Sequence, residues 1–341
     1  MNQMHAPHAT GAQALRGDQP AREYDVVVVG GGAAGLSAAL VLGRARRRVA
    51  VVDAGRPRNA PAAHMQGFLG SDGLPPTELL AAGRAEVVGY GVDLVPGTVA
   101  AISPCAPTSA RSRRWFTVDL ADGSSLRARR VLVTTGLRDE VPDVPGVRER
   151  WGRDLLHCPY CHGYEVRDQP LGVLAGAPTA VQDSVAHAHL LRQWSDDVVL
   201  FTNGATLTAD QREQLVARAV GIVDTPVVSL VVEDDRITGV ELAHGQVVPR
   251  TAVFVRPRLV PNDGLLADLG CATDDAGWVR VDATGATSVA GVWAAGNAVD
   301  PRAQVITAAG EGSAAAIALN NDLVVEDIPL AVDNFRQGLP V

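Results

Sequence analysis

The amino-acid sequence predicts an α/β protein made of two Rossmann-like, three-layer domains, the second of which is inserted into the first. Three observations favour this fold. A strand, a glycine turn, a helix and a second strand follow one another over residues 24–55, and the same order recurs over residues 170–204. Residues 288–323 then give a strand, another glycine turn and an Ala-rich helix, which complete the first unit. A content of 35 glycines with 4% aromatic residues suits the tight strand-to-helix turns of such folds.

Length, charge and hydropathy exclude several classes of protein. A chain of 341 residues is expected to form two domains, and 47% hydrophobic residues suffice for sizeable cores. The net charge of −8, with Arg44–Arg48 as the densest basic run, argues against nucleic-acid binding. Because no apolar run reaches the roughly 20 residues that cross a bilayer, no membrane partner is expected.

The N-terminal residues 1–23 are polar, with scattered Gly and Pro and no apolar core segment. They predict a disordered tail rather than a signal peptide or a membrane anchor. We therefore expect a cytoplasmic protein, in which two cysteines spaced by two residues are more often redox-active or metal-binding than structural. The four cysteines are also too few for a disulfide scaffold.

The first unit carries a phosphate-binding turn. The apolar run Val26–Val29 predicts a buried strand, and GxGxxG follows at once with Gly30, Gly32 and Gly35. The first glycine permits the tight turn, the second lets the backbone approach a pyrophosphate, and the third lets helix and strand pack closely. Asp53 ends the next strand, where it can accept hydrogen bonds from ribose hydroxyls. Together these features predict a dinucleotide site.

The rest of the chain divides between two domains. A loop over 58–76, a helix over 77–91 and a hairpin with its following strand over 116–136 continue the first unit. A segment rich in proline and acidic residues, "LRDEVPDVPGV", then predicts a hinge. We assign residues 24–141 and 263–330 to a discontinuous first domain and residues 142–262 to a central domain. Residues 331–341 are expected to form a C-terminal tail.

The central domain begins with "LLHCPYCHGYE", which contains Cys158 and Cys161 with His157 and His162 on their outer flanks. The spacing is compatible with a c-type haem attachment site, a zinc site, a structural disulfide or a redox-active dithiol. Haem attachment follows export, and neighbouring residues rarely close on one tetrahedral zinc, so no metal site is expected. A disulfide across so small a loop would stabilise little. The redox dithiol is favoured, while Cys105 and Cys271 are expected to be bystanders.

These motifs, together with the "TTG" turn and "VWAAGN…QVITAAGEGSAAA", resemble the low-molecular-weight thioredoxin reductases. They resemble more closely the FAD-dependent dithiol oxidases that close disulfides in natural products such as holomycin and gliotoxin. The resemblance covers nearly the whole chain after Tyr24. It implies a thioredoxin reductase-like fold, FAD as cofactor, a homodimer, and a small-molecule dithiol or disulfide as substrate.

The resemblance also implies where FAD binds. It places the pyrophosphate turn at Gly30, Gly32, Ala33, Ala34 and Gly35, and the ribose carboxylate at Asp53. It places the turn near FAD at Thr135 and Gly136. The flavin-side motif is Gly296 and Asn297, and the positions beside the isoalloxazine ring are Gln304 and Val305. The helix that opens near Thr307 would aim the positive end of its dipole at the flavin.

Three departures from the reductases concern the route of the electrons. Asn297 stands where an Asp is usual. The turn "AGAPTA" places Ala175 and Ala177 at two glycine positions, and Pro178 lacks a donor N–H. The segment "FTNG", residues 201–204, has no cation for a 2′-phosphate. We expect that the central domain has kept an NAD(P)-binding fold in a degenerate form.

By resemblance, Cys161 faces the flavin and forms the charge-transfer thiolate, and Cys158 exchanges with substrate. His162 would carry the proton, because imidazole titrates near neutrality, and His157 is a second candidate. The favoured function is dithiol oxidation, with O2 as acceptor and hydrogen peroxide as product. The alternatives are an NAD(P)H-dependent disulfide reductase and a non-catalytic, flavin-binding redox sensor.

Overall fold

The computed structural model describes residues 22–106, 113–176 and 181–338. Its first sheet has seven strands in the order β3-β2-β1-β6-β5-β4, with β17 paired to β6. The bounds of these strands are β1 Arg22–Val29, β2 Val49–Asp53, β3 Asp93–Pro96, β4 Val99–Pro104, β5 Phe116–Leu120, β6 Ser125–Val133 and β17 Val292–Ala294. Strand β17 lies some 160 residues after β6 in the chain, so the first domain is closed by residues that follow the second.

The first sheet is buried on both faces. Along β1, Val27 and Val29 belong to one apolar cluster, and Val26 and Val28 belong to the other. This explains the continuous run of valines in the sequence, since alternate side chains of a strand point to opposite faces. Helices α1 (Ala33–Arg44), α2 (Pro76–Gly89) and α8 (Val305–Arg336) belong to this domain.

The central domain contains a parallel sheet of five strands in the order β11-β10-β9-β15-β8. The bounds are β8 Leu155–Leu156, β9 Leu171–Leu174, β10 Val198–Phe201, β11 Val220–Val223 and β15 Ala252–Val255. Helices α3 (Val147–Arg150), α4 (Pro159–His162), α5 (Val181–Leu191) and α6 (Ala209–Ala217) accompany this sheet. A separate antiparallel sheet joins β12 (Val227–Glu233), β13 (Arg236–Leu242) and β14 (Val247–Pro249).

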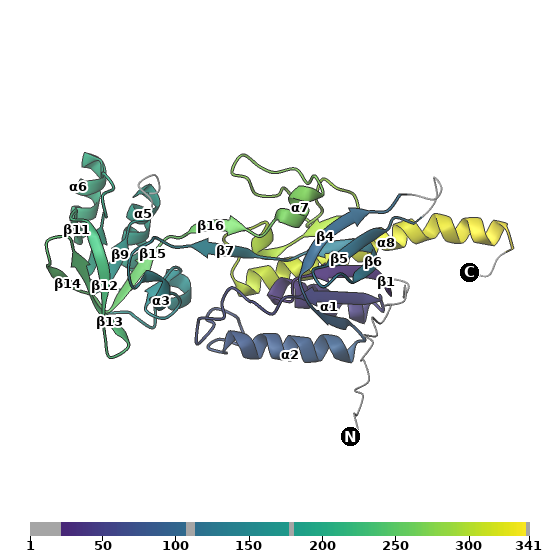
Figure 1. Ribbon diagram of the computed structural model, residues 1–341, viewed down its shortest axis with the longest axis horizontal. Helices are drawn as coiled ribbons and strands as arrows, with labels where there is room; N and C mark the ends of the chain where they lie inside the picture. The colour runs from purple at the N-terminus through teal and green to yellow at the C-terminus, as the bar shows by residue number, and fades with distance from the viewer. Residues whose placement is uncertain (1–21, 107–112, 177–180, 339–341) are drawn as a thin grey trace, which may run out of the picture.

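Two short strands connect the lobes. Strand β7 (Leu137–Glu140) leaves the first domain and pairs antiparallel with β16 (Arg258–Pro261), which returns to it. Figure 1 shows this ribbon as the bridge between the two lobes. After β16 come α7 (Gly264–Asp268) and the 3-10 turn η2 (Gly296–Ala298). The predicted α/β fold with two Rossmann-like units, one inserted in the other, matches this arrangement.

Two predicted boundaries differ from the structure. Strand β1 already begins at Arg22, inside the expected tail 1–23, and α8 continues to Arg336, inside the expected tail 331–341. The stop signal for this helix is Gly338, whose φ of 68° is the left-handed conformation typical of a helix C-terminus. Pro329 lies inside α8, and the helix continues through it.

Ion pairs hold the second half of α8 against β6. The side chains of Arg129 and Arg130 are charged, yet these residues are only 3% and 2% exposed. Arg129 donates to Glu326 at 2.7 Å and to Asp327 at 2.6 Å, and Arg130 lies 3.2 Å from Glu326. A buried charge is tolerated only when it is paired in this way. Along the described residues, no helix is both long and apolar enough to span a bilayer.

Candidate active site

The glycine turn after β1 has the geometry that each glycine was predicted to supply. Gly30 has a φ of 107°, and a Cβ there would lie 2.5 Å from the carbonyl oxygen of Thr134. A Cβ at Gly35 would lie 1.9 Å from the Gly30 oxygen, so helix and strand pack without room for a side chain. A Cβ at Gly32 would meet nothing within 4 Å, which leaves space for a phosphate. Gly32 is also the N-cap of α1 and has no side-chain cap, so backbone N–H groups remain for an anion.

Asp53 lies beside this turn at the end of β2. Its carboxylate accepts a hydrogen bond from Gly31 N at 3.1 Å and from the Arg84 guanidinium at 3.0 Å. A Cβ at Gly31 would lie 2.8 Å from the same carboxylate, so this second glycine of "GGGAAG" is also required. Asp53 is therefore fixed next to the phosphate turn, where an acidic side chain can reach a ribose.

The flavin-side residues lie where α8 begins. Gly296 N donates to Glu311 at 2.8 Å, and a Cβ at Gly296 would lie 3.1 Å from Ala34 in the first turn of α1. Gln304 is the N-cap of α8, and Val305 is its first residue. The first turns of α1 and α8 thus meet beside η2. The residues present fit FAD: α1 offers uncapped N–H groups that could bind its phosphates, and α8 begins at the predicted flavin-side motif.

Thr135 and Gly136 lie at the passage between the domains. The Thr135 hydroxyl donates to Asn262 O at 2.7 Å, and the Asn262 side chain donates back to Thr135 O at 3.0 Å. These two hydrogen bonds join the residue at which the chain leaves the first domain to the residue at which it returns. The Thr135 hydroxyl is engaged in one of them, and the role of Thr135 near FAD stays a prediction.

Asn297 has a distinct set of partners. Its amide nitrogen donates to the carbonyl oxygens of Asp300 and Ala303 at 2.8 and 3.0 Å, and its oxygen accepts from Arg58 at 3.3 Å. A carboxylate cannot donate to two carbonyls. Arg58 also forms a bidentate pair with Asp139 at 2.7 and 2.6 Å. The asparagine thus forms part of a network that reaches from the flavin-side motif to the connecting strand β7.

The cysteine pair is a disulfide at the start of the central domain. Cys158 and Cys161 are bonded, with their Cα atoms 5.2 Å apart. Cys158 is the N-cap of α4, and its carbonyl accepts from the backbone N–H groups of Cys161 and His162 at 3.1 Å. Gly163 follows, and a Cβ there would lie 2.8 Å from the Trp194 ring. Tyr160, 65% exposed, packs edge-on against the same Trp194.

His157 lies between the cysteine pair and the first domain. Its Nδ1 is 3.3 Å from Val255 O, at the carboxyl end of β15. Burial, followed by the charge of Arg58, lowers the pKa of His157, and Asp139 opposes this. The network around Arg58 therefore places Asn297 and the residue before Cys158 in one neighbourhood. Sequence analysis missed Arg58, Asp139 and Trp194, none of which belongs to a motif.

The segment "FTNG" lies beside an ion pair between Asp224 and Arg212. Thr202, after β10, donates to Asp224 at 3.2 Å, and Arg212 holds both Asp224 oxygens at 2.8 Å. Asn203 accepts from Val227 N at 3.1 Å. The hydrogen bond from Arg212 holds the pKa of Asp224 below its ordinary value, so this carboxylate is charged. Ala177 and Pro178 of the preceding turn lie outside the described residues.

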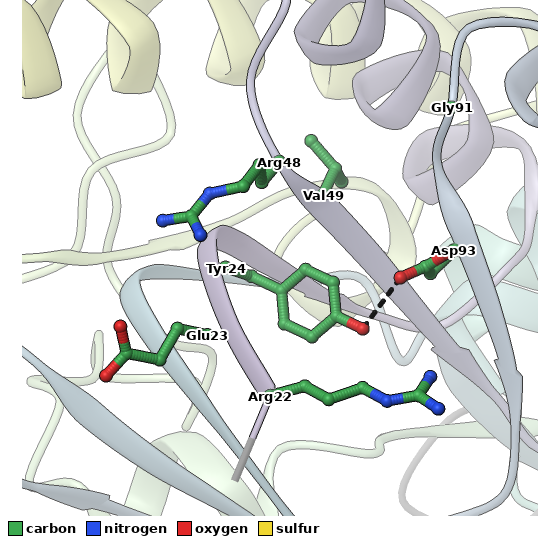
Figure 2. A pocket seen from close by; sticks show the side chains of 7 residues that line it. All are labelled: Arg22, Glu23, Tyr24, Arg48, Val49, Gly91 and Asp93. Carbon is green, nitrogen blue, oxygen red and sulfur yellow. Dashed lines mark hydrogen bonds between the residues drawn. The ribbon is translucent and has the colours of Figure 1, made fainter. Parts of the chain in front are cut away.

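Two further features do not join this site. Figure 2 shows a depression at the amino ends of β1, β2 and β3, where the Tyr24 hydroxyl donates to Asp93 at 2.8 Å. It lies at the sheet edge opposite the glycine turn. Cys105 is half-buried and Cys271 is buried, and both are free thiols. Within the described ranges, no group of three or more His, Cys, Asp or Glu side chains is placed to hold a metal ion.

Comparison with known proteins identifies the family. The model of the pyridine nucleotide-disulphide oxidoreductases matches residues 24–312. The chain belongs to this family. Its members bind FAD, so FAD is the cofactor of this protein, and the protein is an oxidoreductase that acts on sulfur groups. The glycine turn stays the predicted site of its pyrophosphate.

Several of the similar relatives and solved structures are thioredoxin reductases by name. The chain is 32% identical to the thioredoxin reductase sirT of Leptosphaeria maculans, over 87% of this chain and 93% of that protein. It is 36% identical to a probable thioredoxin reductase of Arthroderma benhamiae, over 54% of this chain but only 45% of that protein. The crystal structure of HlmI matches with 59% identity and a TM-score of 0.87, over 92% of this chain and 96% of that one.

A thioredoxin reductase structure from Bacillus anthracis matches with 32% identity and a TM-score of 0.82, over 89% of this chain and 99% of that one. The resemblance predicted from the motifs, and the thioredoxin reductase-like fold, are therefore confirmed.

The environment of His162 predicts the pH dependence of the exchange step. Burial lowers its pKa from the ordinary value of 6.5, and Glu165 opposes this. A base acts in its neutral form, so we expect the rate of flavin reduction by a dithiol to fall only below about pH 6.5. Replacing Glu165 with Gln should move this acid limb to lower pH, and His162→Gln should lose roughly a hundredfold in rate. Stopped-flow absorbance between pH 5 and 9 measures both effects; an acid limb above pH 7 would contradict them.

Proposed function

We propose that the protein is an FAD-dependent dithiol oxidase that closes a disulfide in a small-molecule dithiol and passes the electrons to O2. The observation that carries this proposal is the Asp224–Arg212 pair beside Thr202. The Asp224 carboxylate holds the Arg212 guanidinium in an ion pair, so this cation is already engaged and does not await the 2′-phosphate of NADPH, while the cysteine pair is intact. The resemblance to dithiol oxidases and the similarity to HlmI support the same direction.

The proposed exchange uses the Cys158–Cys161 disulfide and His162 as the base. His162 takes the proton of a substrate thiol, and the thiolate attacks Sγ of Cys158. The Cys158–Cys161 bond breaks, and Cys161 leaves as a thiolate. The second substrate thiol then attacks the substrate sulfur of the mixed disulfide, which releases the product disulfide and leaves Cys158 reduced. When bound, FAD supplies the two-electron chemistry between this dithiol and O2.

The atoms and electrons balance over one turnover. The substrate loses two protons and two electrons as its S–S bond forms, and O2 gains both pairs to become hydrogen peroxide. The protein returns to its disulfide form. Its contribution is to orient the thiols, to move protons at His162 and to stabilise a thiolate at Cys161.

Oxygen consumption tests this proposal. Purified protein loaded with FAD is mixed with dithiothreitol, and O2 uptake is followed with an electrode. We expect one O2 per dithiol oxidised, and catalase should return half of the O2 because the product is peroxide. No O2 uptake with dithiothreitol or with other dithiols would reject the oxidase.

An NAD(P)H-dependent reductase is the competing enzyme. The Arg212 guanidinium is already paired with Asp224, but the fold of the central domain is that of the reductases. A flavin-binding redox sensor is the non-catalytic alternative. The cysteine variants described in the Discussion distinguish it, since a sensor does not require turnover.

We further propose a cytoplasmic homodimer that is joined through α8. One side of this helix is held by Arg129 and Arg130, and other positions expose apolar side chains. These are Ile317, Val324, Val325, Ile328, Val332 and Phe335. Exposed apolar surface of this extent is typical of an interface between proteins.

Substitutions on this surface test the dimer. Val325→Asp combined with Ile328→Asp should convert the dimer into a monomer, because two charges would be buried at the interface. Val216→Asp on α6 is the matched control, since Val216 and Val325 are both 67% exposed. Light scattering coupled to gel filtration gives the masses. A monomeric wild type, or a dimer that survives both substitutions, would contradict the assignment.

A further inference from the structure

The loop that follows β2 is joined to two other parts of the chain by one side chain. Residues 57–63 of this loop, which we name the clamp loop, form two successive turns, each closed by a backbone hydrogen bond of 3.1 Å. Arg58 donates to both carboxylate oxygens of Asp139, at 2.7 and 2.6 Å, and to the side-chain oxygen of Asn297 at 3.3 Å. Asp139 belongs to β7, which links the domains, and Asn297 belongs to the predicted flavin-side motif. The clamp loop therefore fixes the connecting strand to the first domain.

The clamp loop also touches the central domain directly. Gly152 lies between α3 and β8, and a Cβ there would lie 2.9 Å from Cβ of Pro61 and 3.7 Å from the backbone nitrogen of Ala62. Gly152 has a φ of 77°, which residues with a side chain rarely adopt. A glycine at this position thus lets the two domains approach closely. The charge of Arg58 reaches the central domain as well, because, after burial, it is the next cause that lowers the pKa of His157.

The ion pair between Arg58 and Asp139 resists opening. The side chain of Asp139 is 7% exposed and that of Arg58 is 30% exposed. A bidentate pair of this kind combines two charge-assisted hydrogen bonds with a fixed geometry. If the arginine moved away, a nearly buried carboxylate would lose its partner, which is strongly destabilising. The pair therefore favours the orientation in which β7 lies against the clamp loop.

The connection between the domains would otherwise permit them to turn. The chain crosses in β7 and β16, which pair over four residues each, 137–140 with 258–261. Domains joined by short segments are expected to move relative to each other unless further contacts hold them. The clamp loop supplies such contacts, to the connecting strand through Arg58 and to the central domain through Pro61.

We propose that Arg58 is a positioning residue: with Pro61 it clamps the central domain to the first domain, and it so keeps the redox disulfide in one orientation toward the flavin-side motif during turnover. The catalytic meaning of this inference rests on the proposed dithiol oxidase function. In that cycle the disulfide is the group of the central domain that exchanges electrons with FAD, and O2 arrives by diffusion. One orientation of the domains therefore serves every step.

The distance between two spin labels, one on each domain, tests the clamp without turnover. Val88 on α2 and Val216 on α6 are both exposed. They are replaced by cysteine and labelled in FAD-loaded Cys105→Ser protein, in which the redox disulfide is closed and Cys271 is buried. Dilution with unlabelled protein removes distances between subunits. Pulsed electron paramagnetic resonance should give one narrow distance distribution, and Arg58→Gln should broaden it or add a second maximum.

Two matched controls separate the clamp from a general loss of stability. Arg127→Gln is the control for Arg58→Gln, because Arg127 is also partly exposed and donates to Glu23 at 2.6 Å within the first domain. Gly245→Ala is the control for Gly152→Ala. Both glycines have a left-handed φ, of 84° and 77°, but a Cβ at Gly245 would meet nothing within 4 Å. We expect both controls to keep the narrow distribution and Gly152→Ala to broaden it.

The rate of flavin reduction shows whether this orientation matters for the chemistry. Under anaerobic conditions with saturating dithiothreitol, Arg58→Gln should reduce its bound FAD roughly tenfold or more slowly than the wild type, because a displacement of about 1 Å can cost up to a hundredfold in rate. Rates are compared per bound FAD. Arg127→Gln should match the wild type.

The outcomes distinguish this inference from the function on which it rests. Two distances in the protein with Arg58 intact, or identical distributions for Arg58→Gln and its control, would overturn the clamp. An altered distribution with an unchanged rate of flavin reduction would overturn the positioning role. If Arg58→Gln fails to fold, Gly152→Ala decides in its place, and a distribution equal to that of Gly245→Ala overturns the proposal. A protein that consumes no O2 with any dithiol would reject the oxidase, while the distance comparison would still test the clamp.

Discussion

Replacing either cysteine of the disulfide with serine is expected to lower dithiol oxidation by roughly a thousandfold or more, while FAD stays bound. Cys158 and Cys161 form the only disulfide found in the described part of the chain. Without it, a substrate thiolate has no sulfur to attack, and the electrons have no covalent route toward the flavin. Steady-state O2 uptake and the visible absorbance of the purified variants measure activity and FAD content.

The two variants should differ in one respect. Cys161→Ser leaves the exchanging thiol and should form a stable mixed disulfide with glutathione disulfide at Cys158, seen as an added mass. Cys158→Ser should form such an adduct much more slowly. Cys105→Ser is the control, because this half-buried free thiol lies 3.4 Å from the Thr117 hydroxyl on β5, and the variant should keep full activity. An active Cys158→Ser variant would contradict the roles assigned to the two cysteines. Cysteine variants that lose turnover but keep any binding function unchanged would favour the redox sensor.

Gly312→Ala is expected to destabilise the first domain by roughly 3 kcal/mol or more, because the added methyl group meets backbone that cannot move aside. A Cβ at Gly312, on α8, would lie 2.0 Å from the Ala34 carbonyl oxygen on α1. The two helices would have to separate, and both begin at the proposed FAD site. We therefore expect loss of FAD together with the loss of stability, measured by thermal unfolding and by flavin absorbance after gel filtration.

Gly310 provides a matched control on the same helix. A Cβ at Gly310 would meet nothing within 4 Å, and Gly→Ala in a helix interior stabilises by about 0.5–1 kcal/mol. Gly310→Ala should therefore raise the melting temperature and keep FAD. A Gly312→Ala protein with the wild-type melting temperature and flavin content would show that the α1–α8 crossing is not as close as described.

The sequence predicted those features that depend on neighbouring residues. The spacing of Gly30, Gly32 and Gly35 is enough to predict a turn, since each glycine is required by contacts within one βαβ unit. The cysteine pair was found in the same way. The α/β fold followed from the order of strands and helices, and its insertion followed from the second glycine turn that precedes α8.

The remaining features join residues that are far apart in the chain, and no local pattern carries them. Arg58 and Asn297 are separated by 239 positions and Arg58 and Asp139 by 81. The ring of His187 on α5 packs against Phe254 of β15, 67 positions later in the chain. One signal was available and missed: two arginines inside an apolar strand, Arg129 and Arg130, must be paired with acids elsewhere. The structure supplies them from α8.

The central claim concerns where the electrons come from, and anaerobic reduction of the flavin tests it most directly. The FAD-loaded protein is mixed without O2 with dithiothreitol, NADPH or NADH, and the flavin absorbance is followed in a stopped-flow instrument. We expect the dithiol to bleach the flavin absorbance. In the same time, NADPH and NADH should leave the flavin oxidised. Adding O2 after the dithiol should restore the absorbance. Rapid bleaching by NADPH at low concentration would contradict the account and identify the protein as a disulfide reductase.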